Sequence, residues 1–506
     1  MLSKIMSFAL TGLEGVPVEV ETDINNGLPA YELVGLPDVA VKESRERVRS
    51  ALKNSRFRFP TAKITVNLAP ADLKKEGSVF DLAIAVGILR ATEQLRADCG
   101  GIVFLGELAL DGGLRAVTGI LPLLISAKAA GYTRFILPAG NAEEASYIDG
   151  VEVYAAKDLC SVAAHLLGEA ELARVPVRTF CPAGAEGERF DLSFVRGQAI
   201  ARRALEVAVS GGHNILLVGP PGAGKTMLAR CIPGIMPDMT FEEALEATKI
   251  HSVAGALGGQ GILTRRPFRT PHHTATTVSM CGGGTKGVRP GEISLAHCGV
   301  LYLDEMPEYH RSTLEALRQP LEDKCITVTR SSGAVTFPAN FMLCASMNPC
   351  PCGNYGSADR PCTCTPAMIH KYRARISGPL LDRIDIRVEV DAVKYDELVS
   401  QAEEESSAQV KARVEAARAV QRERFRGESI RTNAEMGERE MRRYCALGEE
   451  CERILRRSFE RMHLSARARA RILKVARTIA DLAGEEDIAP AHLLEAISYR
   501  NFDDLG

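Results

Sequence analysis

Hydrophobic and polar positions divide the chain into three regions with different periodicity. In the first, residues 1–175, "AKITVNLAP" (62–70) alternates as a half-buried strand does, whereas "SVFDLAIAVGILRA" (78–91) repeats with helical spacing. "GIVFLGELAL" (101–110) and "TRFILPAG" (133–140) are strand-like runs that end at turn residues. This mixture predicts an α/β domain over residues 1–175.

The second region, residues 195–392, replaces alternation with short continuous apolar runs. The runs are "HNILLVG" (213–219), "GVLYLDE" (299–305) and "NFMLCASMN" (340–348). Strands buried on both faces have this pattern, so the runs predict a parallel sheet covered by helices on both sides. Residues 176–194 are rich in Pro, Gly and charge, and we expect them to link the two domains.

The third region, residues 393–506, has helical periodicity. "DELVSQAEEESSAQVKARVEAARAVQRERF" (396–425) predicts a long, charged, solvent-exposed helix. "ARARILKVARTIADLAG" (468–484) predicts an amphipathic helix that stops at Gly484. The fold class expected for the whole chain is therefore α/β, with a helical C-terminal lid.

Composition sets limits on this picture. A chain of 506 residues is long enough for about three domains, and its net charge of −2 leaves nucleic-acid binding to local basic patches. The first residues lack the apolar run of a signal peptide, and no run approaches the roughly 18 apolar residues of a membrane span. With 14 cysteines and no export signal, we expect a cytoplasmic protein with reduced thiols and no membrane contact.

A phosphate-binding loop, "GPPGAGKT", stands between an apolar strand and a helix. It matches G-x-x-x-x-G-K-[ST] in full, and Lys225 is expected to reach the β- and γ-phosphates while Thr226 binds Mg²⁺. The residues expected to bind ATP are Gly219, Pro220, Pro221, Gly222, Ala223, Gly224, Lys225, Thr226 and Met227. The alternative is a chance Gly-rich turn, which the flanking strand and helix disfavour.

Two further strand ends carry polar residues suited to ATP hydrolysis. Asp304 and Glu305 end the run "GVLYLDE", where Asp304 would coordinate Mg²⁺ and Glu305 would polarise the attacking water. Asn348 ends "NFMLCASMN" and is a candidate to orient that water. The alternatives are an acidic strand cap and a turn-forming Asn before Pro349.

A cysteine cluster follows Asn348 in "CPCGNYGSADRPCTC". Cys350, Cys352, Cys362 and Cys364 lie within fifteen residues and are candidate ligands of a structural Zn²⁺. The C-x-C spacing is tighter than the usual C-x₂₋₄-C, which would strain the geometry, so His370 is an alternative ligand. Reduced loop thiols without metal are the other alternative.

These motifs together resemble the AAA+ ATPases. The segments "RPFRTPHHTATTVSMCGGGTKGVRPGEISLAHCGVLYLDEMPEY", "ISGPLLDRIDIRVEV" and "LSARARARILKVARTIADL" are similar to the magnesium-chelatase-related branch, specifically the ComM (YifB-type) family. The resemblance covers nearly the whole chain. It implies an AAA+ P-loop domain with a helical lid, and assembly into a hexamer.

The resemblance also implies roles for single residues. Asn348 matches the sensor-1 residue, and Arg383 in "LLDRID" matches the arginine finger that enters a neighbouring subunit's site. Arg467 matches the sensor-2 arginine of the lid, with Arg469 and Arg471 as alternatives. Guanidinium groups at these places would neutralise charge on the transferring phosphoryl group. Without the resemblance, a surface or structural ion pair would be the expected role of each arginine.

A hairpin is expected just before the Asn348 strand, in "CITVTRSSGAVTFPANF" (325–341). It resembles the pre-sensor-1 hairpin of the minichromosome-maintenance helicases, whose tip faces the central pore. Arg330 near the tip would contact DNA phosphates, and Lys286 and Arg289 in a Gly-rich insert are further candidates. A surface hairpin with a solvated Arg is the alternative.

The first region resembles the Lon-protease C-terminal fold without its catalytic dyad. Val79 stands where the Ser nucleophile is expected, and Leu123 where its Lys is expected. Residues 1–175 are therefore interpreted as a non-proteolytic ring or DNA-binding platform. A dyad of Ser78 with Lys75 is the remaining alternative.

The sequence thus favours an ATP-hydrolysing hexameric motor on single-stranded or branched DNA. By resemblance its activity is helicase-like branch migration in recombination and natural transformation. One alternative is a chelatase-type ATPase that drives metal insertion through partner subunits. Another is an ATP-regulated scaffold.

Overall fold

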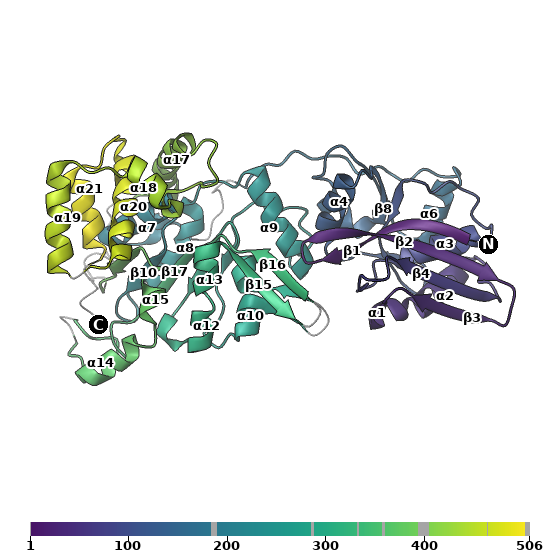
Figure 1. Cartoon of the computed structure of the whole chain (residues 1–506), viewed down its shortest axis with the longest axis horizontal. Coiled ribbons are helices and arrows are strands. Elements are labelled where there is room, and N and C mark those ends of the chain that lie inside the picture. Colours follow the sequence, from purple (N-terminus) through teal and green to yellow (C-terminus); the bar gives the residue numbers. More distant parts are fainter. Residues whose placement is uncertain are drawn as a thin grey trace.

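The computed structural model describes residues 2–183, 190–284, 288–330, 333–356, 360–392, 404–462 and 464–500 of the chain. Figure 1 shows an elongated molecule with an N-terminal sheet domain (purple to blue), a central domain (teal to green) and a C-terminal helical region (yellow). None of the described helices combines the length and the apolar character that crossing a membrane requires.

The N-terminal domain is built on a mixed seven-stranded sheet in the order β3-β4-β2-β1-β5-β8-β9. The strands are β1 (Leu2–Thr11), β2 (Glu14–Asn25), β3 (Ala30–Val34), β4 (Lys63–Ala69), β5 (Ile102–Phe104), β8 (Arg134–Pro138) and β9 (Glu152–Ala156), with helices α2 (Ser44–Asn54), α3 (Asp81–Ala91), α4 (Ile120–Ala129) and α6 (Leu159–Leu166). The alternation predicted over 62–70 is confirmed, since every second side chain of β4 is buried. The run 101–110 is not one strand: it forms β5 and the two-residue β6 (Glu107–Leu108), separated by Leu105 and Gly106.

The central domain contains the predicted parallel sheet, in the order β11-β14-β17-β10-β18. Its strands are β10 (Ile215–Val218), β11 (Phe268–Arg269), β14 (Val300–Leu303), β17 (Met342–Met347) and β18 (Ile386–Glu389), and all four neighbouring pairs are parallel. Ile215 and Leu217 of β10 belong to one hydrophobic core, whereas Leu216 and Val218 belong to another. The continuous apolar run is thereby explained, because the strand buries both faces.

Helices cover both faces of this sheet. The helices of this domain include α7 (Ala199–Gly211), α8 (Lys225–Ile235), α9 (Phe241–Ala254), α13 (Arg318–Asp323), α14 (Pro366–Arg373) and α15 (Gly378–Leu381). The predicted hairpin is present as antiparallel β15 (Cys325–Arg330) and β16 (Gly333–Pro338). The Gly-rich insert forms a small ribbon of β12 (Gly282–Gly283) and β13 (Arg289–Pro290).

The C-terminal region is helical as predicted: α17 (Ser407–Arg424), α18 (Glu438–Tyr444), α19 (Glu449–Arg461), α20 (Ala466–Ala483) and α21 (Pro490–Ser498). The long helix predicted over 396–425 begins only at Ser407, because Ser406 and Gln409 form a capping box there. Residues 393–403 lie outside the described part. Helix α20 ends where predicted, with Gly484 in the left-handed conformation at φ 73°.

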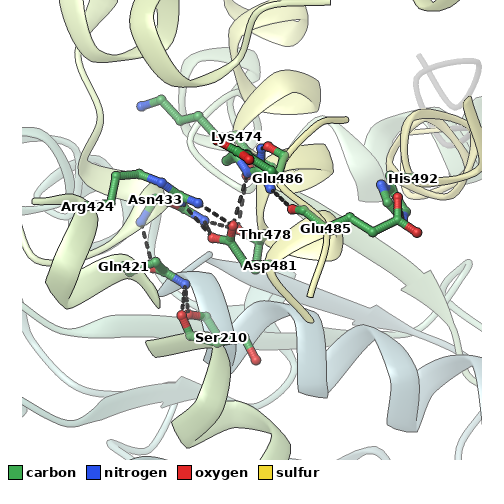
Figure 2. Close-up of polar contacts among 12 residues, drawn as sticks. Ser210, Gln421, Arg424, Asn433, Lys474, Thr478, Asp481, Glu485, Glu486 and His492 are labelled. Atoms are coloured by element: carbon green, nitrogen blue, oxygen red, sulfur yellow. Dashed lines mark hydrogen bonds and ion pairs between the residues drawn. The ribbon is translucent and has the colours of Figure 1, made fainter. Parts of the chain in front are cut away.

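A buried polar network holds the lid helices to the central domain (Figure 2). Asp481 of α20 accepts hydrogen bonds from Arg424 at 2.7 Å, Asn433 at 2.7 Å and Arg477 at 3.0 Å. Gln421 of α17 donates to the Ser210 carbonyl of α7 at 2.9 Å. Because its hydrogen bonds join α17, α20 and α7, the network fixes the lid on the core.

Within the described residues, the contacts between the N-terminal and central domains include helix α9 and the β15–β16 hairpin. Ser252 of α9 donates a short hydrogen bond to buried Glu144, and α4 packs on α9. Gly12, in the turn between β1 and β2, lies against the hairpin, since a Cβ there would lie 2.7 Å from Val335 Cγ1. The hairpin is therefore in direct contact with the N-terminal domain.

Candidate functional site

The phosphate loop lies between β10 and the N-terminus of α8. Gly222 and Gly224 have φ values of 81° and 89°, which side chains with a Cβ rarely adopt. Gly219 needs its small size for another reason: a Cβ there would lie 2.1 Å from the Val390 carbonyl oxygen. The loop thus presents backbone N–H groups at a helix N-terminus, the arrangement that binds phosphate.

Lys225, the first residue of α8, is folded over this loop. Its Nζ donates to the carbonyl oxygens of Gly219 at 2.6 Å and Pro220 at 2.8 Å, and to Asn348 Oδ1 at 3.1 Å. Burial lowers the pKa of Lys225. The sequence-predicted sensor-1 residue and the loop lysine are therefore in direct contact, although 123 residues separate them.

Asp304 lies beside Thr226 at the neighbouring strand end. Thr226 Oγ1 donates to Asp304 Oδ2 at 3.1 Å, so the two candidate Mg²⁺ ligands are adjacent. Its Oδ1 accepts from Ser346 at 2.5 Å and from Tyr302 at 3.0 Å. Burial alone would raise the pKa of this carboxyl, yet the three hydroxyl donors together hold the pKa below its ordinary value.

Tyr302 and Ser346 were missed at the sequence level. Each stands two residues before a predicted site residue on a strand, Tyr302 before Asp304 and Ser346 before Asn348. Residues two apart on a strand face the same side of the sheet. A polar residue at that spacing inside an apolar run was the signal that could have identified them.

Glu305 follows in the left-handed backbone conformation, with φ 50° and ψ 51°. Such a conformation is costly for a residue with a side chain and is common in active sites. Its N–H donates to Ser346 Oγ at 3.1 Å, which fixes the turn. The Glu305 side chain is exposed, as a group that polarises a water molecule must be.

The candidate arginine finger and sensor-2 residue lie near one another. Arg383 is buried, donates to the Pro379 carbonyl at 2.5 Å and forms a short ion pair with Glu322 of α13. The hydrogen bond from Arg383 lowers the pKa of Glu322, and the charge of exposed Arg467 lowers it further. The two alternatives for Arg467 have other partners: Arg469 pairs with Glu452 at 3.7 Å, and Arg471 with buried Asp385.

Arg330 and Arg289, two of the candidate DNA-binding residues, lie on antiparallel strand pairs. Arg330 is the last residue of β15, opposite Gly333, and the tip at 331–332 lies outside the described residues. Arg289 is exposed on β13, opposite Gly283, whereas Lys286 lies outside the described residues. The register places Arg330 at the hairpin end, as the sequence suggested.

The N-terminal domain has apolar packing where a Ser-Lys dyad would stand. Val79 and Leu123 are 8% and 1% exposed and belong to one hydrophobic core. The alternative dyad is not assembled: Ser78 donates a short hydrogen bond to Glu107, and buried Lys75 donates one to the Pro70 carbonyl. Neither Val79 with Leu123 nor Ser78 with Lys75 therefore brings a nucleophile to a lysine that could activate it.

The four cysteines converge after Asn348. Cys350 Sγ lies 3.4 Å from Cys352 Sγ and 3.7 Å from Cys362 Sγ, and Cys364 completes a group whose sulfur atoms all lie within 4.8 Å. The strain expected from the C-x-C spacing therefore does not separate the ligands. His370, the alternative ligand, is not part of this group.

The chain matches three descriptions of one protein family. "Magnesium chelatase, subunit ChlI" matches residues 191–398, "Subunit ChlI of Mg-chelatase" matches 20–141, and "Magnesium chelatase, subunit ChlI C-terminal" matches 404–500. These matches span the N-terminal, central and lid regions in turn.

Individual relatives align over different lengths. YifB of Escherichia coli is 45% identical over 507 residues, covering 100% of this chain and 98% of the relative. Competence protein ComM of Haemophilus influenzae is 43% identical over 504 residues, covering 99% and 97%. Lon protease 2 of Bacillus subtilis is 28% identical over 127 residues (25% and 23%), and DNA helicase MCM8 of Gallus gallus 24% over 229 residues (43% and 24%). The chain belongs to the ComM/YifB-type family of magnesium-chelatase-related proteins.

Proposed function

We propose that this chain is an AAA+ ATPase that works as a hexameric motor on DNA. The observation that carries the proposal is the assembly of Lys225, Thr226, Asp304 and Asn348 at adjacent strand ends. Phosphate cradle, Mg²⁺ ligands and water-orienting amide are the parts that phosphoryl transfer requires. Glu305, exposed beside them, supplies the carboxylate that polarises water.

Few residues separate the ATP site from the hairpin that would move DNA. Strand β16 ends at Pro338 and β17 begins at Met342, so the hairpin is three residues from the strand that ends beside Asn348. A shift of Asn348 between nucleotide states would therefore move the hairpin and Arg330 at its end. A cation there would hold phosphates without reading bases.

The ring is supported by the position of Arg383. It forms an ion pair with Glu322 and donates to the Pro379 carbonyl, and these described contacts do not include the phosphate loop of its own chain. A guanidinium offered to a neighbour's ATP would make hydrolysis depend on assembly. Arg383 would have to exchange its Glu322 partner for that phosphate.

The DNA substrate is supported by the names of two relatives. The Haemophilus influenzae relative is called a competence protein, and the partial match in Gallus gallus a DNA helicase. We propose branch migration of recombining strands in the cytoplasm during natural transformation. The 14 cysteines fit a reducing compartment.

A chelatase-type motor is the second candidate, and the family descriptions favour it. In that case the chain would drive metal insertion through partner subunits. An ATP-regulated scaffold would keep the site but scarcely turn ATP over. The three functions differ in what stimulates ATP hydrolysis.

The deciding experiment measures steady-state ATPase activity with single strands, forks, four-way junctions and no DNA. Branch migration is followed on the same junctions. We expect stimulation by DNA in the wild type and none in Lys225→Ala. ATP turnover that no DNA alters would refute the motor on DNA, and ATP-dependent metal insertion with added partner subunits would favour the chelatase.

A further inference from the structure

The cysteine cluster has the dimensions of a metal site. A tetrahedral Zn²⁺ with Zn–S bonds of about 2.3 Å requires S···S separations of about 3.8 Å. The three measured separations among Cys350, Cys352 and Cys362 are 3.4, 3.7 and 3.6 Å. A disulfide would need about 2.05 Å in one pair, and none of the three separations approaches it.

Backbone N–H groups surround the sulfur atoms, as they do in compact metal-binding turns. Tyr355 N–H donates to Cys350 Sγ at 3.3 Å. Asn354 and Thr363 N–H groups donate to the Cys352 sulfur. These N–H donors would stabilise the negative charge of the clustered thiolates. Such stabilisation is needed even with a bound ion, because a charge of +2 neutralises only part of the charge of four thiolates.

The cluster is also built against the phosphate loop. A Cβ on Gly353 would lie 2.4 Å from Pro221 Cδ, so the turn between Cys352 and Asn354 touches the loop directly. On the other side, Cys350 follows Asn348 by two residues, and Asn348 accepts the hydrogen bond from Lys225. Two connections therefore join this cluster to the ATP site.

The last ligand leads into helix α14. Cys364 precedes Thr365, the N-cap of α14, whose hydroxyl accepts from Met368 N–H. Arg373, at the end of the same helix, donates to the Pro349 carbonyl at 3.1 Å and lies over the Tyr355 ring at 5.2 Å. Fixing the four sulfur atoms would thus fix the helix against the loop after Asn348.

We propose that Cys350, Cys352, Cys362 and Cys364 bind one structural Zn²⁺, and that this zinc knuckle braces the phosphate loop through the contact of Gly353 with Pro221. The metal site stands independently of the activity, whereas its effect on nucleotide binding rests on the proposed ATPase function. Because the Gly353 contact and the Asn348 strand converge on one loop, loss of the metal loosens the ATP site without removing any ATP ligand.

The first test is metal content. Full-length protein purified without chelator should contain about one zinc per chain by plasma mass spectrometry. Cys352→Ser combined with Cys362→Ser should abolish it, and Cys181→Ser, at an exposed cysteine elsewhere, should not. Exchange of Zn²⁺ for Co²⁺ in the unmutated protein should give the intense visible bands of tetrahedral cobalt thiolate. Wild-type protein that holds no zinc and takes up neither ion overturns the site.

The second test separates the brace from the metal. Gly353 and Gly356 both have positive φ, 81° and 79°, but among the residues that the structure describes only Gly353 has a neighbour within 4 Å of an added Cβ. Gly353→Ala should keep its zinc and raise the Kd for a fluorescent ATP analogue about tenfold, because small displacements in such sites are costly. Gly356→Ala carries the same backbone strain and should bind as wild type does.

The outcomes are distinguishable. Equal Kd values for the two glycine variants would show that the contact of Gly353 with Pro221 does not support the phosphate loop. They would not affect the assignment of the zinc site. A wild-type protein that binds no ATP overturns the brace together with the proposed function, while metal content still decides the site. Zinc that is lost from Gly353→Ala but not from Gly356→Ala would contradict the assignment of Gly353 as a contact outside the ligand set.

Discussion

The N-terminal and central domains are both α/β units, but they differ in the side chains that stand where the sequence suggested catalytic residues. In the N-terminal domain Val79 and Leu123, which the sequence analysis placed where a Ser-Lys dyad is expected, are buried in the core. In the central domain Lys225, Thr226 and Asp304 are polar, and every one has a hydrogen-bonded partner. Two α/β domains can therefore present closed apolar packing or a polar site at such positions, so function must be judged from the site.

The physical difference lies in the free energy of burying each kind of side chain. An apolar side chain in a closed core stabilises the domain and needs no partner. A buried ammonium or carboxylate is tolerated only when donors and acceptors surround it. Three hydroxyl groups face Asp304, which shows that the central domain keeps this set in place.

The largest expected effect is on ATP turnover. Lys225→Ala and Glu305→Gln should each lower the ATPase rate about 10³-fold, because each removes a group that acts on the γ-phosphate or its water. Lys42→Ala, on the surface of the N-terminal domain, is the control and should keep full activity. Turnover that survives Lys225→Ala would mean that this loop is not the ATP site.

The next effect is on stability of the central domain and its lid. Asp385 is 3% exposed, pairs with Arg471 of α20 and accepts from Asn214 N–H at 3.0 Å. Asp385→Ala leaves that guanidinium without its partner, so the free energy of unfolding should fall by about 3–5 kcal/mol. Arg469→Ala breaks only an exposed pair and should cost under about 1 kcal/mol in the same denaturant titration.

The N-terminal domain should respond to apolar truncation instead. Leu123→Ala should cost about 2–5 kcal/mol of unfolding free energy, since it opens a cavity in a closed core. Leu110, 57% exposed, is the control, and Leu110→Ala should change little. A loss at Leu123 no larger than that at Leu110 would argue against its structural role.

A smaller effect is expected from pH. Burial lowers the pKa of His213 from its ordinary 6.5, despite the neighbouring carboxylate of Asp385, so the ring is neutral in the folded protein. The unfolded chain takes up a proton as pH falls below 6.5, and stability should decline there by about 1 kcal/mol per pH unit. His213→Gln should flatten this dependence between pH 7 and 5. An identical slope in both proteins would show that His213 is not its source.

The smallest effect tests the alternative dyad. Ser78→Ala should leave ATP turnover within about twofold of wild type. It should also remove no peptidase activity, because the Ser78 hydroxyl donates to Glu107 and not to Lys75. A peptidase activity that disappears with Ser78→Ala would reverse the interpretation of the N-terminal domain.

Local signals predicted much of this molecule. The apolar runs located β10, β14 and β17, the Gly-rich motif located the loop between β10 and α8, and Gly484 marked the end of α20. Each depends on residues within one or two turns of each other: strand burial, a positive φ or a helix cap. The late start of α17 was missed because helical composition continued past the real cap at Ser406.

What the sequence by itself determined is the order of elements and the identity of the residues at the strand ends. Only the tertiary structure decided that Ser346 and Tyr302 support Asp304, that Arg383 pairs with Glu322, and that Gly353 touches Pro221. Those contacts join separate strands, helices and loops, most of them far apart in sequence. Their distances depend on how strands align in the sheet and how loops pack over its edge, which no short pattern along the chain encodes.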